Sequence, residues 1–190
     1  MKTGLYFGSF NPVHIGHLAI ANYFVEYTDI EQIWFIISPH NPLKKKNTLL
    51  NDQFRYDILQ MAIQDDNRFQ VSDIEFRMPQ PSYTIDTLTY LQEKNPGNEF
   101  ILLMGSDGLS SFHKWKNHSV ITEKYKRYIY PRPESENIDF TQHKNILVVD
   151  APLIQISSSF IREAFKSGKD IRHFLPHNVY EYIIKKNFYS

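Results

Sequence analysis

Residues 8–17 read GSFNPVHIGH, and this stretch decides the fold. It follows the apolar residues 5–7 and precedes residues 18–25, whose apolar side chains recur at helical spacing. This order predicts a strand, a tight loop and a helix. At such a junction the amide N–H groups of the loop and of the first helical turn point at one spot, where the helix dipole favours an anion. The stretch therefore predicts a phosphate-binding site.

Two histidines of this stretch are three residues apart. His14 and His17 would lie on one face of the new helix, so that both imidazoles can donate an N–H to the same ligand. Gly8 would let the backbone come close to that ligand. A solvated helix start and half of a metal site are the alternative interpretations of a His-x-x-His pair. Gly8, the Asn-Pro turn and Gly16 favour the phosphate site.

Composition limits the possible classes of protein. A chain of 190 residues with 42% hydrophobic and 15% aromatic residues predicts one packed domain, residues 1–190. Lys plus Arg equals Asp plus Glu at 21 each, which argues against the basic field of proteins that bind nucleic acid or anionic membranes. The absence of cysteine excludes disulfides and cysteine nucleophiles. With no signal peptide and no membrane-length apolar run, we expect a soluble cytoplasmic protein.

The rest of the chain alternates between strand and helix patterns. Strands are predicted at 32–37, 69–73, 100–104, 128–130 and 146–149, and helices at 82–91, 158–166 and 176–185. A further helix is predicted with Phe54, Ile58, Leu59 and Ala62 on one face and Arg55 nearby. The alternation predicts an α/β fold, a parallel sheet with helices on both faces, and residues 156–190 as a C-terminal helical segment of the same domain.

Several chemically active residues directly follow predicted strands. In open parallel sheets, ligands bind at the carboxyl ends of the strands, where the strand order reverses. We therefore expect one crevice to gather side chains that are far apart in the sequence. The candidates are His14, His17, Lys44, Asp107 and Arg132.

Three further segments have ordinary structural interpretations when each is considered alone. Residues 82–88, SYTIDTL, favour a capped helix start with Asp86 in the first turn. Residues 105–109, GSDGL, favour a strand end and a turn, and Trp115 beyond them would be core or rim packing. Residues 156–162, ISSSFIR, open another helix, in which Arg162 is equally consistent with a surface charge.

These segments together resemble a known family. Residues 8–17 resemble the signature Gly-x-Phe-x-Pro-x-His-x-Gly-His of the nucleotidyltransferase superfamily, whose Rossmann-like fold binds the triphosphate of ATP there. Residues 82–88, and residues 105–109 with Trp115, resemble the bacterial nicotinate mononucleotide adenylyltransferases. Residues 156–162 are similar to that family's Ile-Ser-Ser-Thr-x-Ile-Arg, with Ser159 in place of Thr. The resemblance covers nearly the whole chain and is loosest at residues 134–144.

The resemblance implies a role for each matching residue. His14 and His17 would be catalytic, and Trp115 would stack on the pyridine ring. ATP contacts are implied for Gly8, Ser9, Phe10, Gly16, Gly105, Asp107, Ser158, Ser159 and Arg162. Contacts with nicotinate mononucleotide are implied for Lys44, Tyr83, Thr84, Leu109, Trp115 and Arg132. The loop with Lys44 departs from the family's Pro-Pro-His-Lys, so it stays open which of Lys44, Lys45 and Lys46 meets a phosphate, and a solvated charge run is equally consistent.

The implied reaction is adenylyl transfer from ATP to nicotinate mononucleotide, which gives nicotinate adenine dinucleotide and pyrophosphate. Mg²⁺ would enter with ATP, so no protein metal ligands are expected. Nicotinamide mononucleotide and phosphopantetheine are alternative acceptors, and a non-catalytic nucleotide sensor is an alternative of another class. A zinc hydrolase is disfavoured because no third ligand follows the histidines at useful spacing. The sequence does not predict the oligomeric state.

Overall fold

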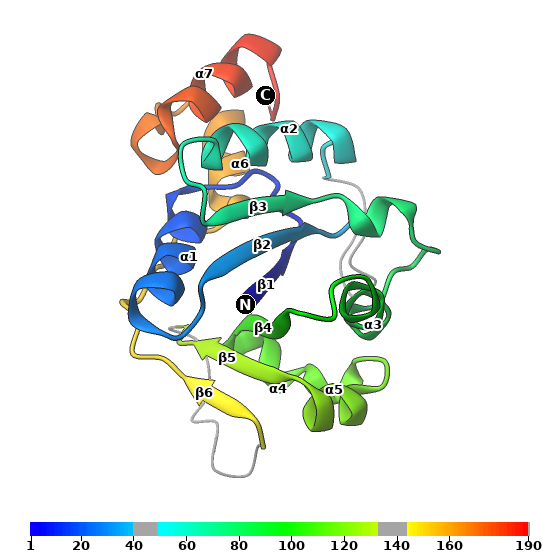
Figure 1. Cartoon of the computed structure of the whole chain (residues 1–190). Helices are drawn as coiled ribbons and strands as arrows, with labels where there is room; N and C mark the ends of the chain where they lie inside the picture. Colours follow the sequence, from blue (N-terminus) through cyan, green and yellow to red (C-terminus); the bar gives the residue numbers. More distant parts are fainter. Residues whose placement is uncertain (40–48, 133–143, 190) are drawn as a thin grey trace.

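A six-stranded parallel sheet forms the centre of the protein. The computed structural model describes residues 1–39, 49–132 and 144–189. The strand order is β3-β2-β1-β4-β5-β6, and every neighbouring pair is parallel (Figure 1). The strands are β1 (Lys2–Gly8), β2 (Gln32–Ile37), β3 (Phe69–Ser72), β4 (Glu99–Gly105), β5 (Lys126–Tyr130) and β6 (Ile146–Val148).

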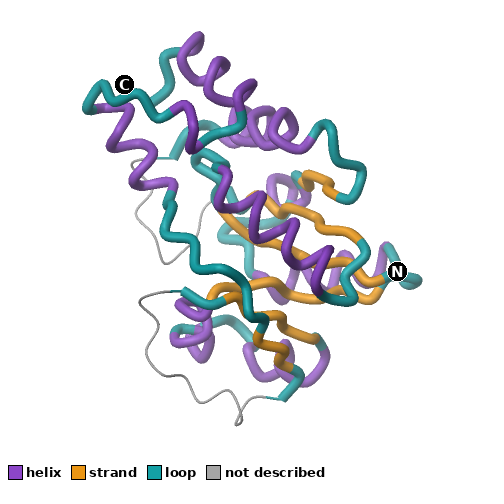
Figure 2. Tube along the Cα trace, turned by 90° about the vertical axis from the view of Figure 1, so that its left-hand side faces the viewer, coloured by secondary structure: helices purple, strands orange, loops and turns teal. Residues whose placement is uncertain are grey.

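Helices cover both faces of the sheet, as Figures 1 and 2 show. Alternate side chains of a buried strand point to opposite faces. Ile101 and Leu103 of β4 therefore pack with α1, α2, α6 and α7, whereas Leu102 and Met104 pack with α3, α4 and α5. The helices are α1 (Ile15–Tyr27), α2 (Asp52–Ile63), α3 (Thr84–Lys94), α4 (Ser106–Ser110), α5 (His118–Lys124), α6 (Ser158–Lys166) and α7 (His177–Lys186), with the 3₁₀ turns η1 (Ile74–Arg77), η2 (Phe112–Lys114) and η4 (Arg172–Phe174).

The strand order reverses between β1 and β4. The chain moves outward from β1 to β2 and β3, then returns through α3 to pair β4 with the other side of β1. The helices that follow β1 and β4 lie on opposite faces, because α1 packs in one core cluster and α4 in the other. In open parallel sheets, ligands bind outside the carboxyl ends of the strands at the point where the strand order reverses. The predicted α/β architecture is confirmed.

Most of the predicted elements are present, with differences in detail. The helix α3 begins at Thr84 because Ser82 and Tyr83 precede it in extended or turn conformation, and Pro176 is the N-cap of α7 instead of its first helical residue. In α2, Ile58 and Leu59 are buried together as predicted, but Phe54 does not share their buried face. Arg55 is fully buried beside Ile58, whereas Phe54 stays 37% exposed.

Candidate active site

The loop between β1 and α1 lies at the point where the strand order reverses. Its last residue, His14, is the N-cap of α1 and has an extended backbone (φ −144°, ψ 169°). The helix begins at Ile15, and the N–H groups of His17 and Leu18 already donate to the carbonyl of His14, so the N–H groups of Ile15 and Gly16 are the ones without an acceptor within the helix. These groups and the dipole of α1 make the position favourable for an anion, as the sequence predicts.

The two histidines of the loop are stacked on each other. Their ring centroids are 3.8 Å apart and their planes are inclined by 29°. The backbone N–H of His14 donates to Nδ1 of His17 across 3.3 Å. Because that nitrogen accepts a hydrogen bond, the neutral His17 ring carries its proton on Nε2. The hydrogen-bond donor of the His17 ring is therefore its Nε2–H group.

The folded protein keeps His14 uncharged near neutral pH. Only 3% of the residue is exposed, and burial, followed by the positive charge of Arg132, lowers the pKa of His14 from 6.5 to about 3. His14 would thus meet a phosphate as a neutral hydrogen-bonding group that carries no positive charge. Gly16 has no side chain to obstruct this ring, since a Cβ there would lie 3.0 Å from Nδ1 of His14.

Side chains from distant segments hold the carbonyl groups of the loop. Arg162 donates to the carbonyl of Asn11 across 2.8 Å, and the hydroxyl of Ser158 donates to the carbonyl of Pro12 across 2.9 Å. A second nitrogen of Arg162 donates to the hydroxyl of Ser159. The structure thus brings the predicted residues of α6 to the predicted loop, and their observed partners include the protein's own backbone.

Gly8 and Phe10 shape the loop together. A Cβ on Gly8 would come within 2.9 Å of the Phe10 ring, so the space beside Gly8 is filled by Phe10 and not left open for a ligand. Phe10 has a φ of 43° and is 2% exposed. Its ring packs edge-on against His17 and Phe35. Any contact of Phe10 with a phosphate would therefore come from its backbone.

A polar group of residues lies at the carboxyl ends of β4 and β5. Arg132 donates to the hydroxyl of Tyr130 across 2.9 Å, and its Nε lies 3.9 Å from a carboxylate oxygen of Asp107. The hydroxyl of Ser106 accepts from the backbone N–H of Arg132. Gly105 allows this arrangement, because a Cβ there would lie 2.2 Å from the Asp107 carboxylate. Because β4 lies between β1 and β5 in the sheet, the carboxyl ends of these three strands are neighbours.

Lys116 joins the two segments that are predicted to bind the acceptor. Lys116 pairs with Asp86 across 2.8 Å and lies 4.7 Å from the centre of the Tyr83 ring. These contacts tie the start of α3 to the segment that holds Trp115. Trp115 is half-buried, and its ring packs at 52° against Phe112 with the centroids 5.4 Å apart. The segments that carry Tyr83 and Trp115 therefore meet.

Three further residues are predicted to contact nicotinate mononucleotide, namely Leu109, Lys44 and Thr84. Leu109 is 5% exposed and packs in the core cluster of α3, α4 and α5, so only its backbone is available to a ligand. Lys44, with Lys45 and Lys46, lies outside the described residues. Thr84 is the first residue of α3 and is half-buried.

Two buried ionisable residues support the site without having been predicted for it. Arg55 donates to carbonyls of the loops after β1 and β2, and Glu75 accepts from the hydroxyls of Ser82 and Thr87 across 2.9 and 2.8 Å. The only sequence signal for Arg55 is its helical spacing from Ile58 and Leu59, which puts it on the buried stripe of α2.

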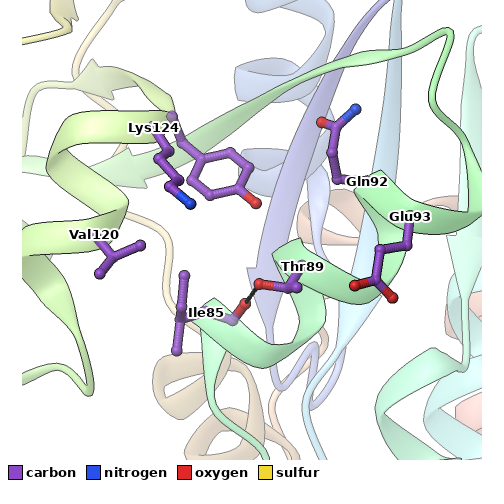
Figure 3. Close-up of a pocket in the computed structure, with 7 residues that line it drawn as sticks. Ile85, Thr89, Gln92, Glu93, Val120 and Lys124 are labelled. Carbon is purple, nitrogen blue, oxygen red and sulfur yellow. Dashed lines mark hydrogen bonds between the residues drawn. The ribbon is translucent and has the colours of Figure 1, made fainter.

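A surface groove of about 370 Å³ lies between α3 and α5, away from these residues (Figure 3). Its lining includes Lys124 and Tyr125, which precede β5, whereas Arg132 follows β5, so the groove and Arg132 lie at opposite ends of this strand. Within residues 1–39, 49–132 and 144–189, no three His, Cys, Asp or Glu side chains gather to hold a metal ion. Over the same residues, no helix is long and apolar enough to span a membrane.

The fold is similar to that of solved adenylyltransferases. The Plasmodium falciparum nicotinic acid mononucleotide adenylyltransferase complexed with NaAD matches with a TM-score of 0.85 and 21% identity, over 99% of this chain and 97% of that one. The same protein complexed with APC matches with a TM-score of 0.82 and 20% identity, over 99% and 96%. At these identities the likeness shows a shared fold.

Sequence relatives show the family. The cytidylyltransferase-like family model matches residues 5–164. A "Probable nicotinate-nucleotide adenylyltransferase" of Flavobacterium johnsoniae is 52% identical over the full length of both chains. One of Cytophaga hutchinsonii is 47% identical over 100% of this chain and 99% of its own. This chain therefore belongs to the cytidylyltransferase-like nucleotidyltransferases and, among them, to the nicotinate-nucleotide adenylyltransferase family.

Proposed function

We propose that the protein transfers the adenylyl group of ATP to nicotinate mononucleotide, giving nicotinate adenine dinucleotide and pyrophosphate in NAD biosynthesis. The observation that carries the proposal is the stacked pair of His14 and His17 at the start of α1, where the strand order of the sheet reverses. The full-length relatives at 52% and 47% identity support the choice of acceptor.

The reaction needs positioning more than proton transfer. An oxygen of the mononucleotide 5′-phosphate attacks the α-phosphorus of ATP, and the bond from that phosphorus to the bridging oxygen breaks. Pyrophosphate leaves with the electron pair. The attacking phosphate is already an anion near neutral pH, so no general base is required. Catalysis would come from alignment and from stabilising the charge on the oxygens.

The loop and α6 would bind the triphosphate. His17 would donate its Nε2–H to phosphate oxygens, and the uncharged His14 would add a second hydrogen bond. Among the described residues, Arg162 donates to Asn11 and Ser159, and a guanidinium has five N–H donors, so further donors of Arg162 would bind the leaving pyrophosphate. Asp107, exposed at the end of β4, would accept from a ribose hydroxyl. Mg²⁺ would enter bound to the ATP phosphates, as part of the substrate.

Trp115 and the start of α3 would select the acceptor. The indole face would stack on the electron-poor pyridinium ring, a cation–π contact of about 0.5–2 kcal/mol. Amide N–H groups at Tyr83 and Thr84 would hold the nicotinate carboxylate, because a helix N-terminus favours an anion. The uncharged amide of nicotinamide mononucleotide would leave these donors poorly paired.

A pyrophosphate-release assay with Mg²⁺ and ATP tests the proposal. The acid mononucleotide, the amide mononucleotide and phosphopantetheine are compared as acceptors at equal concentration. We expect pyrophosphate release to be fastest with the acid, with nicotinate adenine dinucleotide as the product. A preference for the amide would contradict the carboxylate pocket. ATP binding without pyrophosphate release from any acceptor would indicate a nucleotide sensor.

A further inference from the structure

Arg55 is the most buried charge beside the loop, and the proposed chemistry gives it no role. It belongs to α2, and none of its surface is exposed. Its pairing with Asp52 across 2.6 Å uses one of its five N–H donors. The other four go to backbone carbonyls, namely Ser9 (2.6 Å), Ser38 (3.0 Å), Pro39 (3.3 Å) and Leu50 (3.0 Å). All five donors therefore have a partner.

These carbonyls come from two connections of the chain. Ser9 follows β1, whereas Ser38, Pro39 and Leu50 belong to the connection between β2 and α2. A single nitrogen of Arg55, Nη1, donates to both Ser9 and Ser38, so the two strand ends are joined through one atom. The planar guanidinium group has several N–H donors in fixed directions, so it can hold carbonyl groups of both strand ends at once. The single ammonium group of a lysine cannot do this in the same geometry.

The contact with Ser9 fixes the direction of the next amide. The peptide from Ser9 to Phe10 is trans, and the carbonyl and N–H of a trans peptide point in opposite directions. With the Ser9 carbonyl held by Arg55, the N–H of Phe10 must point away from α2. In the described part of the chain, this N–H makes no backbone hydrogen bond. Likewise, the hydroxyl of Ser158 holds the carbonyl of Pro12. The N–H of Val13 belongs to the same trans peptide, so it points away from Ser158.

We infer that Arg55 is a positioning residue, which holds the loop after β1 so that the Phe10 amide is presented to the triphosphate. This inference rests on the proposed function, because it concerns the loop that would bind ATP. Arg55 itself touches no substrate in this account. Its effect is on alignment, and misplacement of a reacting group by about 1 Å can cost on the order of 10²-fold in rate.

The chain offers a matched control for this role. Arg127 of β5 is also fully buried, where it lies over the Phe112 ring and donates to the carbonyl of Lys144. It lies near the start of β5, whereas the site is at the other end of that strand. Arg55→Lys and Arg127→Lys therefore both replace a buried guanidinium by an ammonium, and only Arg55→Lys alters the loop.

The experiment measures binding of inorganic tripolyphosphate by calorimetry, together with steady-state kinetics and thermal unfolding. We expect Arg55→Lys to weaken tripolyphosphate binding by about tenfold or more and to lower kcat by on the order of 10²-fold, with little change in KM for the acceptor. Arg127→Lys should lower the Tm and leave phosphate binding unchanged. Equal losses in both variants, or unchanged phosphate binding in a folded Arg55→Lys, would overturn the inference.

Amide NMR of the unmodified protein gives a second measurement, which does not depend on the folding of a variant. Addition of tripolyphosphate should shift the Phe10 and Val13 amide resonances, and the inference fails if the phosphate binds while the Phe10 amide stays unmoved. Failure of the proposed function looks different. If the protein binds tripolyphosphate, and Arg55→Lys weakens that binding while Arg127→Lys does not, yet no dinucleotide forms, the positioning role stands and the proposed reaction is wrong.

Discussion

His14 and His17 form a face-to-face pair whose ring centroids are 3.8 Å apart. Two imidazolium ions could not share this arrangement without strong repulsion, and burial keeps one of them neutral, since the pKa of His14 falls to about 3. The His14 N–H holds Nδ1 of His17. The pair therefore acts as a unit in which His14 supports and orients His17.

The first prediction concerns stability in acid. The pKa of His14 is about 3 in the folded protein and 6.5 when unfolded, so between these values the unfolded chain binds a proton that the folded protein does not. The free energy of unfolding should therefore fall as the pH drops from 6.5 towards 3, by up to about 1.4 kcal/mol per pH unit from this group. Urea denaturation across this range measures the slope.

His14→Gln provides the comparison, because glutamine cannot take up the proton. Its denaturation curves should depend less on pH between 6.5 and about 4 than those of the unmodified protein. Below that range the carboxylates with lowered pKa values, such as Asp170 at about 2, contribute to both proteins. If the free energy of unfolding of His14→Gln depends on pH as steeply as that of the unmodified protein, His14 binds a proton in the folded state as readily as in the unfolded chain.

The second prediction separates the two nitrogens of His17. Asn at position 17 can replace Nδ1 as the acceptor of the His14 N–H, but it has no group at the place of Nε2. We expect His17→Asn to keep the Tm near that of the unmodified protein and to lower kcat by on the order of 10² or more. KM for both substrates should change less. His17→Ala should lose both kcat and some stability, and near-normal turnover in either variant would remove His17 from catalysis.

Much of the fold could be predicted from the sequence because its signals are local. The strand at 32–37 is a continuous apolar run between turn residues, and its bounds are as predicted. Likewise, α6 runs from a serine cap to residues before Gly168, which has a φ of 63°. The helix α5, by contrast, was not predicted. It is short, and Ile121 is its only buried residue, so packing supports it more than any local pattern.

The hydrogen bonds that hold the loop between β1 and α1 could not be predicted in the same way. Arg55, Ser158 and Arg162 donate to backbone carbonyls, and because every residue has a carbonyl, no sequence pattern marks the acceptor. The contact between Gly8 and Phe10 has no local signal either: a Cβ on Gly8 would meet the ring of Phe10, a residue with a positive φ that its sequence neighbours do not predict.

The third prediction concerns the stacking of Trp115. Removing a cation–π contact of about 0.5–2 kcal/mol should raise KM for nicotinate mononucleotide about 2- to 30-fold in Trp115→Ala, with kcat and KM for ATP nearly unchanged. In Trp115→Phe, KM for nicotinate mononucleotide should lie between the values of the unmodified protein and of Trp115→Ala. Trp34→Phe is the matched control, since Trp34 packs edge-on against Phe100 within the fold. It also leaves Trp115 as the only tryptophan, so that the mononucleotide should quench the remaining fluorescence.

The last prediction concerns Glu75, which joins the start of α3 to the loop after β2. Only 3% of this residue is exposed, and burial raises the pKa of its carboxyl group above 4.5 although the hydroxyls of Thr87, Ser82 and Ser38 bind it. A buried carboxylate with a raised pKa opposes folding at neutral pH, because the folded state holds the charge less readily than the unfolded chain. Glu75→Gln removes that charge and keeps polar atoms for the hydroxyls.

Glu75→Gln should therefore be as stable as the unmodified protein at neutral pH or more so, whereas Glu75→Ala should lose about 1–3 kcal/mol for each hydroxyl left without a partner. Tyr83 and Thr84 lie between Ser82 and Thr87, so release of these hydroxyls should also disturb the carboxylate pocket. In Glu75→Ala we expect KM for nicotinate mononucleotide to rise more than KM for ATP. Urea denaturation and steady-state kinetics measure both effects. A folded Glu75→Ala with an unchanged KM for the mononucleotide would mean that Glu75 stabilises α3 without shaping the acceptor pocket.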